Sequence, residues 1–212
     1  QQGFNWKFLY PTEKDVENFL SGGTSLWGAN QGYENLGRQH YYNYVKTLPE
    51  NISILEIGFA QGLDQTYLKD NNLLINRNYF GLDVTESFVK HANNKLGWVN
   101  AFKYDGTTIP YEDNFFDNCY LRHVLEHQPH YSTLLKEVFR VVKKEIFINF
   151  FIPPLDILED EIHFEDFTFF HNVYSKPKFL QFIKECGWSI KEEMCFKTSN
   201  STDFIMVLQS EN

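Results

Sequence analysis

A loop of small residues and an acid follows the first strongly apolar run of the chain. Glu56, Gly58, Ala60 and Gly62 alternate with other residues, and small side chains let a backbone turn sharply and approach a ligand before a helix begins. A dinucleotide-binding loop needs glycine at its first, third and sixth positions. Counted from Gly58, the third and sixth positions are Ala60 and Leu63, so a nicotinamide cofactor is disfavoured.

Two carboxylates follow the next apolar runs. Asp83 ends the run Gly81-Leu82-Asp83, where a carboxylate can accept hydrogen bonds from both hydroxyls of a ribose. Asp105 stands before Gly106 after the following run. Taken alone, each has a simpler explanation, because Asp83 can cap a helix and Asp105-Gly106 is an ordinary turn signal.

These residues need a framework that brings the ends of strands together. Short runs rich in β-branched and aromatic residues alternate with segments of helical periodicity, which predicts a mostly parallel α/β sheet. The expected strands are Ile52–Ile57, Tyr79–Val84, Val99–Tyr104, Phe116–Leu121, Glu145–Ile152, Ser189–Phe196 and Phe204–Gln209, and the expected helices between them are Leu63–Lys69, Glu86–Asn94, Tyr131–Val142 and Lys176–Gly187. The last two strands are too close for a crossover helix and should pair antiparallel. The expected fold is a Rossmann-like, doubly wound, seven-stranded sheet that ends in an antiparallel hairpin and has helices on both faces.

The order of the motifs resembles that of class I S-adenosylmethionine-dependent methyltransferases, of the type that acts on small molecules or sugars. The resemblance covers about residues 50–150 and rests on Glu56-x-Gly58-x-Ala60-x-Gly62, Asp83, Asp105, Phe116-Asp117 and the run Arg122-His123-Val124-Leu125-Glu126-His127. Ala60 stands where the family has its middle glycine.

The resemblance implies S-adenosylmethionine as cofactor and S-adenosylhomocysteine as product. It implies that Gly58 and Gly62 line the methionine part, that Asp83 holds the ribose, and that Asp105 reaches the adenine amino group. Residues 121–123 are expected beneath the sulfonium. The expected cofactor contacts are Glu56, Gly58, Phe59, Ala60, Gly62, Asp83, Val84, Asp105, Gly106, Leu121, Arg122 and His123.

A general base is expected among the histidines and acids that follow the fourth and fifth strands. A sulfonium is already an activated leaving group, so the enzyme mainly aligns the nucleophile and excludes water. Only a poor nucleophile such as an aliphatic hydroxyl needs a base. The candidates are His123, His127, Asp160 and His163, with His123 the first choice and His130 a further neighbour. Packing at the strand end for His123, and a structural hydrogen bond for His127, are the competing explanations.

The segment Phe164–Tyr174 resembles the insertion that many such enzymes fold over the acceptor. Phe169 and His171 from this segment, with Trp27 and Tyr33 from the N-terminal part, are expected to line the acceptor site. Aromatic faces beside histidines and carboxylates suit a neutral polyhydroxylated acceptor such as a sugar, although core packing explains the phenylalanines almost as well.

A metal site is not expected. His123-x3-His127 has Val124 where a zinc protease needs glutamate, and the three cysteines form no C-x-x-C pair. The acidic run between Asp156 and Asp166 suggests a solvated loop, with a divalent ion for oxygen methylation as the less favoured alternative.

The amino-acid composition excludes some classes of binding partner. A net charge of −9 and a pI near 5.2 disfavour nucleic acid and anionic membranes, which need clustered Lys and Arg. The longest apolar stretch, Ile146–Ile152, is far shorter than the roughly 20 residues of a membrane span. A soluble cytoplasmic protein is expected, and Gln1 in place of Met is compatible with a domain of a longer glycan-assembling polypeptide.

The sequence thus predicts one structural domain with a helical cap at residues 1–50, a methyltransferase core at 51–212 and an acceptor-covering insertion at about 153–175. The expected reaction is O-methylation of a sugar hydroxyl on a glycan or glycoconjugate. Two alternatives stay open. One is methylation of another small metabolite or lipid-like ring, and the other is a non-catalytic domain that binds a cofactor or a partner.

Overall fold

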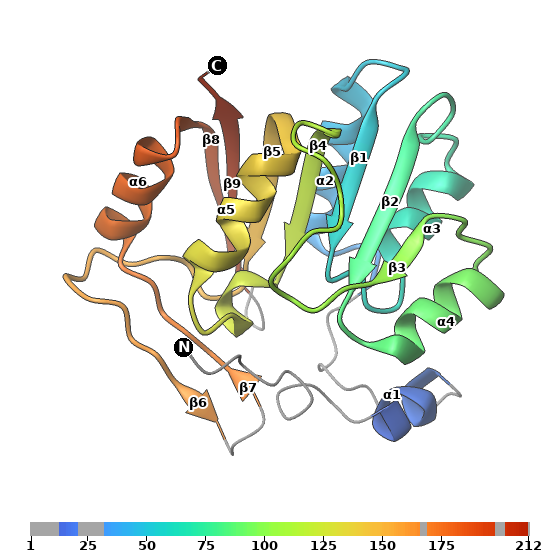
Figure 1. Ribbon diagram of the computed structural model, residues 1–212, viewed down its shortest axis with the longest axis horizontal. Helices are drawn as coiled ribbons and strands as arrows, with labels where there is room; N and C mark the ends of the chain where they lie inside the picture. Colours follow the sequence, from blue (N-terminus) through green and yellow to red (C-terminus); the bar gives the residue numbers. More distant parts are fainter. Residues whose placement is uncertain (1–12, 21–31, 166–168, 198–201, 212) are drawn as a thin grey trace.

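A seven-stranded sheet forms the centre of the computed structural model, which describes residues 13–20, 32–165, 169–197 and 202–211 (Figure 1). The strand order is β3-β2-β1-β4-β5-β9-β8. Five strands pair in parallel, and β9 pairs antiparallel with both β5 and β8. The bounds are β1 (Ser53–Ile57), β2 (Asn78–Asp83), β3 (Ala101–Lys103), β4 (Phe116–Arg122), β5 (Val142–Phe150), β8 (Trp188–Lys197) and β9 (Thr202–Ser210). The expected Rossmann-like fold class, with its antiparallel hairpin, is confirmed.

Helices cover both faces of this sheet (Figure 1). One face is covered by α2 (Leu36–Thr47), α3 (Leu63–Asp70) and α4 (Glu86–Asn94), and the other by α5 (Tyr131–Val141) and α6 (Lys176–Glu185). Successive strand residues point to opposite faces, so on β4 Tyr120 packs beneath α2 whereas Cys119 and Leu121 pack beneath α5. Burial on both faces explains why the strands read as continuous apolar runs.

Each of the seven strands differs from its expected bounds by one to three residues at an end, as β5 and β3 illustrate. β5 begins at Val142 rather than Glu145, directly where α5 ends, because Val142 already pairs with Phe116 of β4. β3 is shorter than the expected Val99–Tyr104, and Val99 is exposed.

The connection from β3 to β4, residues 104–115, contains no helix and is held by α5. Arg140 donates hydrogen bonds to the carbonyl oxygens of Ile109 and Tyr111, at 2.9 and 2.8 Å. Glu137 accepts the backbone N–H of Ile109 at 2.9 Å. The chain crosses here from β3 to β4, on the other side of β1, which makes the carboxyl ends of β1 and β4 the switch point where ligands bind in such sheets.

Further elements lie beyond the carboxyl ends of the strands (Figure 1). The helix α1 (Glu13–Leu20) packs against α4, with Val16 fully buried. The short hairpin of β6 (Phe164–Glu165) and β7 (Phe169–Phe170) contacts the 3-10 turn η2 (Leu125–His127). The proposed boundaries at residues 50 and 153–175 stay predictions. In the described ranges, no helix is both long and apolar enough to cross a membrane.

Candidate functional site

The loop between β1 and α3 contains three residues in the left-handed region. The φ angles are +72° at Gly58, +48° at Ala60 and +71° at Gly62. The N–H of Gly58 donates to the carbonyl of Leu82 at 2.7 Å, which ties the loop to β2. A Cβ at Gly58 would lie 2.7 Å from Cγ2 of Val124, so glycine is required there for space as well as for φ. Ala60 adopts this conformation with its methyl group, at a cost of roughly 1 kcal/mol.

Asp83 joins this loop to the end of β2. Its Oδ2 accepts the N–H of Ala60 at 2.9 Å, and its Oδ1 accepts the N–H of Thr85 at 2.8 Å. Burial raises the pKa of Asp83 to about 6, against the lowering effect of these hydrogen bonds. Asp83 therefore ties the loop to the start of α4, and its contact with a ribose stays a prediction.

Glu56, Phe59 and Val84 face inward rather than toward the loop surface. Glu56 is 3% exposed and accepts a hydrogen bond from the Tyr79 hydroxyl at 3.0 Å, and burial raises its pKa well above the usual range. Phe59 packs on Trp98 with ring centroids 4.8 Å apart, and Val84 packs against the core. Cofactor contacts from these three residues stay predictions and would involve their backbone rather than their side chains.

Asp105 forms a tight turn at the end of β3. Its Oδ1 accepts the N–H groups of Thr107 and Thr108, at 2.8 and 2.7 Å. Burial acts to raise the pKa of Asp105, but these hydrogen bonds lower it overall, so the carboxylate is ionised near neutral pH. Gly106 follows with φ of +84°. The turn and the adenine contact are compatible, because the turn uses Oδ1 and Asp105 is exposed.

Leu121 and His123, at the end of β4, lie in different environments. Leu121 is fully buried in the core beneath α5. His123 has a φ of +54°, and its N–H donates to the carbonyl of Asn149 at 2.8 Å. Burial, followed by the charge of Arg122, lowers the pKa of His123 to about 3. The imidazole is therefore neutral at pH 7.

Asp203 on β9 faces both Arg122 and His123, and the sequence analysis missed it. Its Oδ1 lies 3.4 Å from Nε2 of His123 and 3.6 Å from Nη2 of Arg122. Burial acts to raise the pKa of Asp203, but these neighbours and two asparagines lower it to about 2. The sequence did offer a signal, because Asp203 directly precedes the apolar run 204–208. A carboxylate next to a buried strand is expected to have charged or polar partners.

Glu126, at the centre of the Leu-Glu-His segment, fastens the chain after β5. It is fully buried, and its Oε1 accepts the N–H of Phe151 at 2.6 Å and of Ile152 at 3.3 Å. Burial raises the pKa of Glu126 to about 7. Its backbone carbonyl accepts the N–H of Asn172 at 3.0 Å, so one residue holds both the β5 end and the insertion.

Three imidazole rings surround Phe151, which the sequence analysis did not single out. The ring centroid of Phe151 lies 5.1 Å from that of His123, 5.3 Å from that of His127 and 5.4 Å from that of His171. Nδ1 of His127 is 2.6 Å from the carbonyl of Phe170, and burial lowers its pKa to about 4. This cluster joins His123 to two further predicted site residues.

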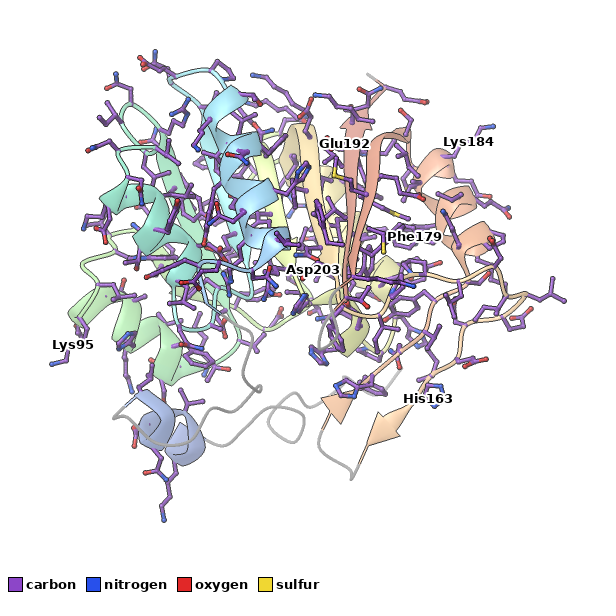
Figure 2. All side chains as sticks on the ribbon, turned by 180° about the vertical axis from the view of Figure 1, so that it is seen from behind. Lys95, His163, Phe179, Lys184, Glu192 and Asp203 are labelled. Carbon is purple, nitrogen blue, oxygen red and sulfur yellow. The ribbon has the colours of Figure 1, made fainter. Side chains whose placement is uncertain are left out.

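Other predicted residues lie apart from this cluster. Asp160 accepts the N–H of Ser175 at 2.7 Å, at the start of α6. His163 is exposed beside Glu161, directly before β6, and lies away from Asp203 (Figure 2). The exposed His130 precedes α5. A catalytic role for Asp160 or His163 remains a prediction.

The structure describes only some of the residues that were predicted to line the acceptor site. Tyr33 lies beside Tyr67, with ring centroids 5.4 Å apart. Trp27 lies outside the described residues, and of Phe169 only the backbone is described. In the part of the chain that the structure describes, no group of three His, Cys, Asp or Glu side chains could hold a metal ion.

The groups at the carboxyl ends of β1, β2 and β3 fit S-adenosylmethionine. The left-handed loop brings backbone close to a ligand, and two carboxylates follow at the ends of β2 and β3. The cofactor carries no phosphate, so its site needs no lysine. Its ribose hydroxyls and adenine amino group are hydrogen-bond donors, which carboxylates accept.

Known proteins that are similar to this chain are methyltransferases. Residues 55–148 match a family model described as a methyltransferase domain. The chain is 26% identical, over 78% of its length and 70% of the relative's, to a demethylmenaquinone methyltransferase of Lactococcus lactis.

Solved structures share the fold at low identity. A SAM-dependent methyltransferase from Methanosarcina mazei has a TM-score of 0.62 at 16% identity, covering 81% of this chain and 96% of that one. A Burkholderia thailandensis 1,6-didemethyltoxoflavin-N1-methyltransferase, solved with 1,6-didemethyltoxoflavin and S-adenosylhomocysteine, has a TM-score of 0.66 at 12% identity, covering 94% of this chain and 87% of that one.

Proposed function

We propose that this chain, whose residues 55–148 match a methyltransferase domain, is a class I S-adenosylmethionine-dependent methyltransferase that methylates a hydroxyl group of a sugar unit in a glycan or glycoconjugate. The observation that carries the proposal is the neutral imidazole of His123, held in a left-handed conformation at the end of β4. A non-glycine residue in that region costs free energy, and such strain clusters at functional sites.

The cofactor, when bound, supplies a methyl group on a sulfonium. Backbone of the Gly58–Gly62 loop would hold its methionine part, Asp83 its ribose and Asp105 its adenine amino group. With the cofactor held at the switch point between β1 and β4, the end of β4, and with it His123, would lie beside the reacting centre.

His123 would accept the hydroxyl proton. As the new oxygen–carbon bond forms, the hydroxyl oxygen gains positive charge and its proton becomes strongly acidic. A neutral imidazole within hydrogen-bond reach of this proton can then take it even though the imidazole is a weak base. The burial that lowers the pKa of His123 favours the neutral form at pH 7.

The acceptor side supports a neutral ring. Phe151 and His171 are only partly buried, and aromatic faces can pack against the C–H face of a sugar. Both histidine neighbours of Phe151 with lowered pKa values, His123 and His127, are neutral near pH 7. The cluster would therefore bind an acceptor by shape and stacking rather than by charge.

A planar ring is the second candidate acceptor. The relative from Lactococcus lactis is a demethylmenaquinone methyltransferase, and the Burkholderia structure holds a didemethyltoxoflavin. The same aromatic cluster would stack against such a ring.

The test is transfer of labelled methyl from S-adenosylmethionine to a panel of free sugars, glycosides, quinols and planar heterocycles. Sugar acceptors should be methylated on oxygen, and His123→Asn should reduce kcat by about 10²–10⁴-fold, the usual contribution of a general base. Asparagine tolerates the left-handed region, so the variant should fold. His91→Asn on α4, outside the predicted cofactor and base residues, is the matched control and should keep full activity.

Each alternative has its own outcome. Transfer to planar rings with no transfer to sugars replaces the sugar proposal by the second candidate. S-adenosylhomocysteine binding with no transfer to any acceptor favours a non-catalytic domain. Full activity of His123→Asn would show that His123 is not the general base.

A further inference from the structure

We propose that Asp203 is the positioning residue for the base: its carboxylate holds the Nε2–H of His123 and so presents Nδ1 to the acceptor hydroxyl. The inference rests on the proposed role of His123. It adds a residue from β9, on the far side of β5 from β4, to a site otherwise built from the loops after β1, β2, β3 and β4.

The Asp203 carboxylate is fixed by two amide groups. Asn149 Nδ2 donates to Oδ1 at 2.9 Å, and Asn35 Nδ2 donates to Oδ2 at 2.8 Å. The Asn35 amide cannot turn over, because its Oδ1 accepts the N–H of Arg38 at 3.0 Å as the N-cap of α2. The carboxylate orientation is therefore set before any ligand binds.

Asn149 holds both members of the pair. Its carbonyl accepts the backbone N–H of His123 at 2.8 Å, while its side chain holds Asp203. The φ of +54° at His123 departs from the strand conformation just where the imidazole approaches β9. The 3.4 Å separation of Nε2 and Oδ1 is long for a hydrogen bond, and such bonds commonly shorten when the substrate complex forms.

The charges around the pair favour an ionised Asp203 and a neutral His123. Arg122 compensates the carboxylate from 3.6 Å, and Arg38 is paired with Asp64 of α3 in a neighbouring buried ion pair. Buried ion pairs add little to stability compared with apolar side chains. Four polar side chains face the buried carboxylate of Asp203, which favours a role in function over a role in stability: Asn35, Arg122, His123 and Asn149.

The proposed step balances in atoms and charge. The acceptor oxygen forms a bond to the methyl carbon, the carbon–sulfur bond breaks, and its electron pair stays on sulfur as S-adenosylhomocysteine forms. The hydroxyl proton passes to Nδ1 of His123, and the resulting imidazolium is stabilised by Asp203 until the proton leaves to solvent. No oxidant or metal is required.

The experiment compares Asp203→Ala, which removes the acceptor of the Nε2 proton, with Asp203→Asn, which keeps an oxygen but no charge. In ¹⁵N-labelled protein without acceptor, the Nε2–H proton of His123 should be protected from solvent exchange, and its signal is assigned by its loss in His123→Asn. We expect Asp203→Ala to abolish that protection and Asp203→Asn to retain it in part. With an acceptor, kcat should fall by about 10²–10³-fold in Asp203→Ala and by less in Asp203→Asn, at unchanged affinity for S-adenosylhomocysteine.

Asp117→Asn is the matched control. Asp117 is an ionised, partly buried carboxylate at the opposite end of β4, where it accepts the N–H of Ser53 at 2.9 Å and pairs with Lys144 at 2.9 Å. This variant should lose stability without changing the His123 signal. Unchanged protection of His123 in Asp203→Ala would overturn the inference even if methyl transfer depends on His123. Protected Nε2–H with no transfer in any variant would instead count against the proposed function.

Discussion

Glu126 Oε1 lies 2.6 Å from the backbone nitrogen of Phe151, although Glu126 has no exposed surface. The contact places a carboxyl group in the interior, where burial raises its pKa to about 7. The ordinary value in an unfolded chain is about 4.3. Glu126 therefore binds its proton more tightly in the folded protein than in the unfolded chain.

The first prediction concerns the pH dependence of stability. Between about pH 4.3 and 7 the unfolded chain releases the Glu126 proton before the folded protein does, so Glu126 lowers the free energy of unfolding as pH rises through this window. Glu126→Gln keeps an oxygen for Phe151 and cannot ionise. From pH 5 to pH 8 the variant should gain stability relative to the wild type by on the order of 2 kcal/mol, measured by urea unfolding.

Glu137→Gln provides a control of opposite sign. The side-chain hydrogen bond from Arg140 is the main cause that lowers the pKa of Glu137, so its contribution is present above the unfolded pKa and lost as pH falls through the folded one. This variant should lose stability at pH 7 and little at pH 3. Parallel stability curves for the wild type and Glu126→Gln would disprove the first prediction.

The second prediction concerns the strained alanine of the cofactor loop. Ala60→Gly should remove roughly 1 kcal/mol of left-handed strain, which corresponds to a rise in Tm of about 2–4 °C in a chain of this size. Ala92→Gly on the buried face of α4 is the matched control, and it should lower Tm because glycine costs about 1 kcal/mol in a helix. A lower Tm for both variants would show that Ala60 is not strained.

The third prediction concerns the close approach of α2 to the sheet. A Cβ at Gly37 would lie 2.4 Å from Nδ2 of Asn149 and 2.5 Å from Oδ1 of Asp203. Gly37→Ala should therefore destabilise the protein by about 1–3 kcal/mol, as overpacking does, despite the better helix propensity of alanine. Gly32→Ala should be nearly neutral in thermal unfolding, because its Cβ meets only the flexible end of Glu34. Equal Tm values for the two variants would contradict this packing argument.

The fourth prediction concerns the cofactor. Calorimetric titration should show micromolar binding of S-adenosylhomocysteine and none of NAD. Asp83→Ala should weaken the binding by about 10–100-fold, the loss expected when charge-assisted hydrogen bonds to two hydroxyls are removed. Asp117→Ala, at the other end of the sheet, should bind as the wild type does. Wild-type affinity in Asp83→Ala would place the ribose elsewhere.

Local sequence patterns predicted the fold and the loop positions well. The alternation of apolar runs located α4 to the residue, and the turn signals at Gly58 and Asp105 coincide with left-handed or hydrogen-bonded turns. These features depend on residues close in sequence, so they can be read from spacing alone.

Contacts between distant residues could not be predicted in this way. Asp203 reaches His123 only through the antiparallel register of β5 and β9, which sets Asn149 opposite Ile205. Phe151 meets its imidazole neighbours because Glu126 fixes the chain after β5. The positions of Asp160 and His163 depend on irregular backbone with no periodic pattern.

The connection of residues 104–115, which contains no helix, should be locally less stable than the rest of the site. This segment carries Asp105 but depends on Arg140 and Glu137 for its attachment to α5. A segment held by a few side-chain contacts opens more readily than a helix packed on the sheet. Its amide hydrogens should exchange together and slow down when adenine binds at Asp105, so cofactor entry and local opening would be one coupled equilibrium.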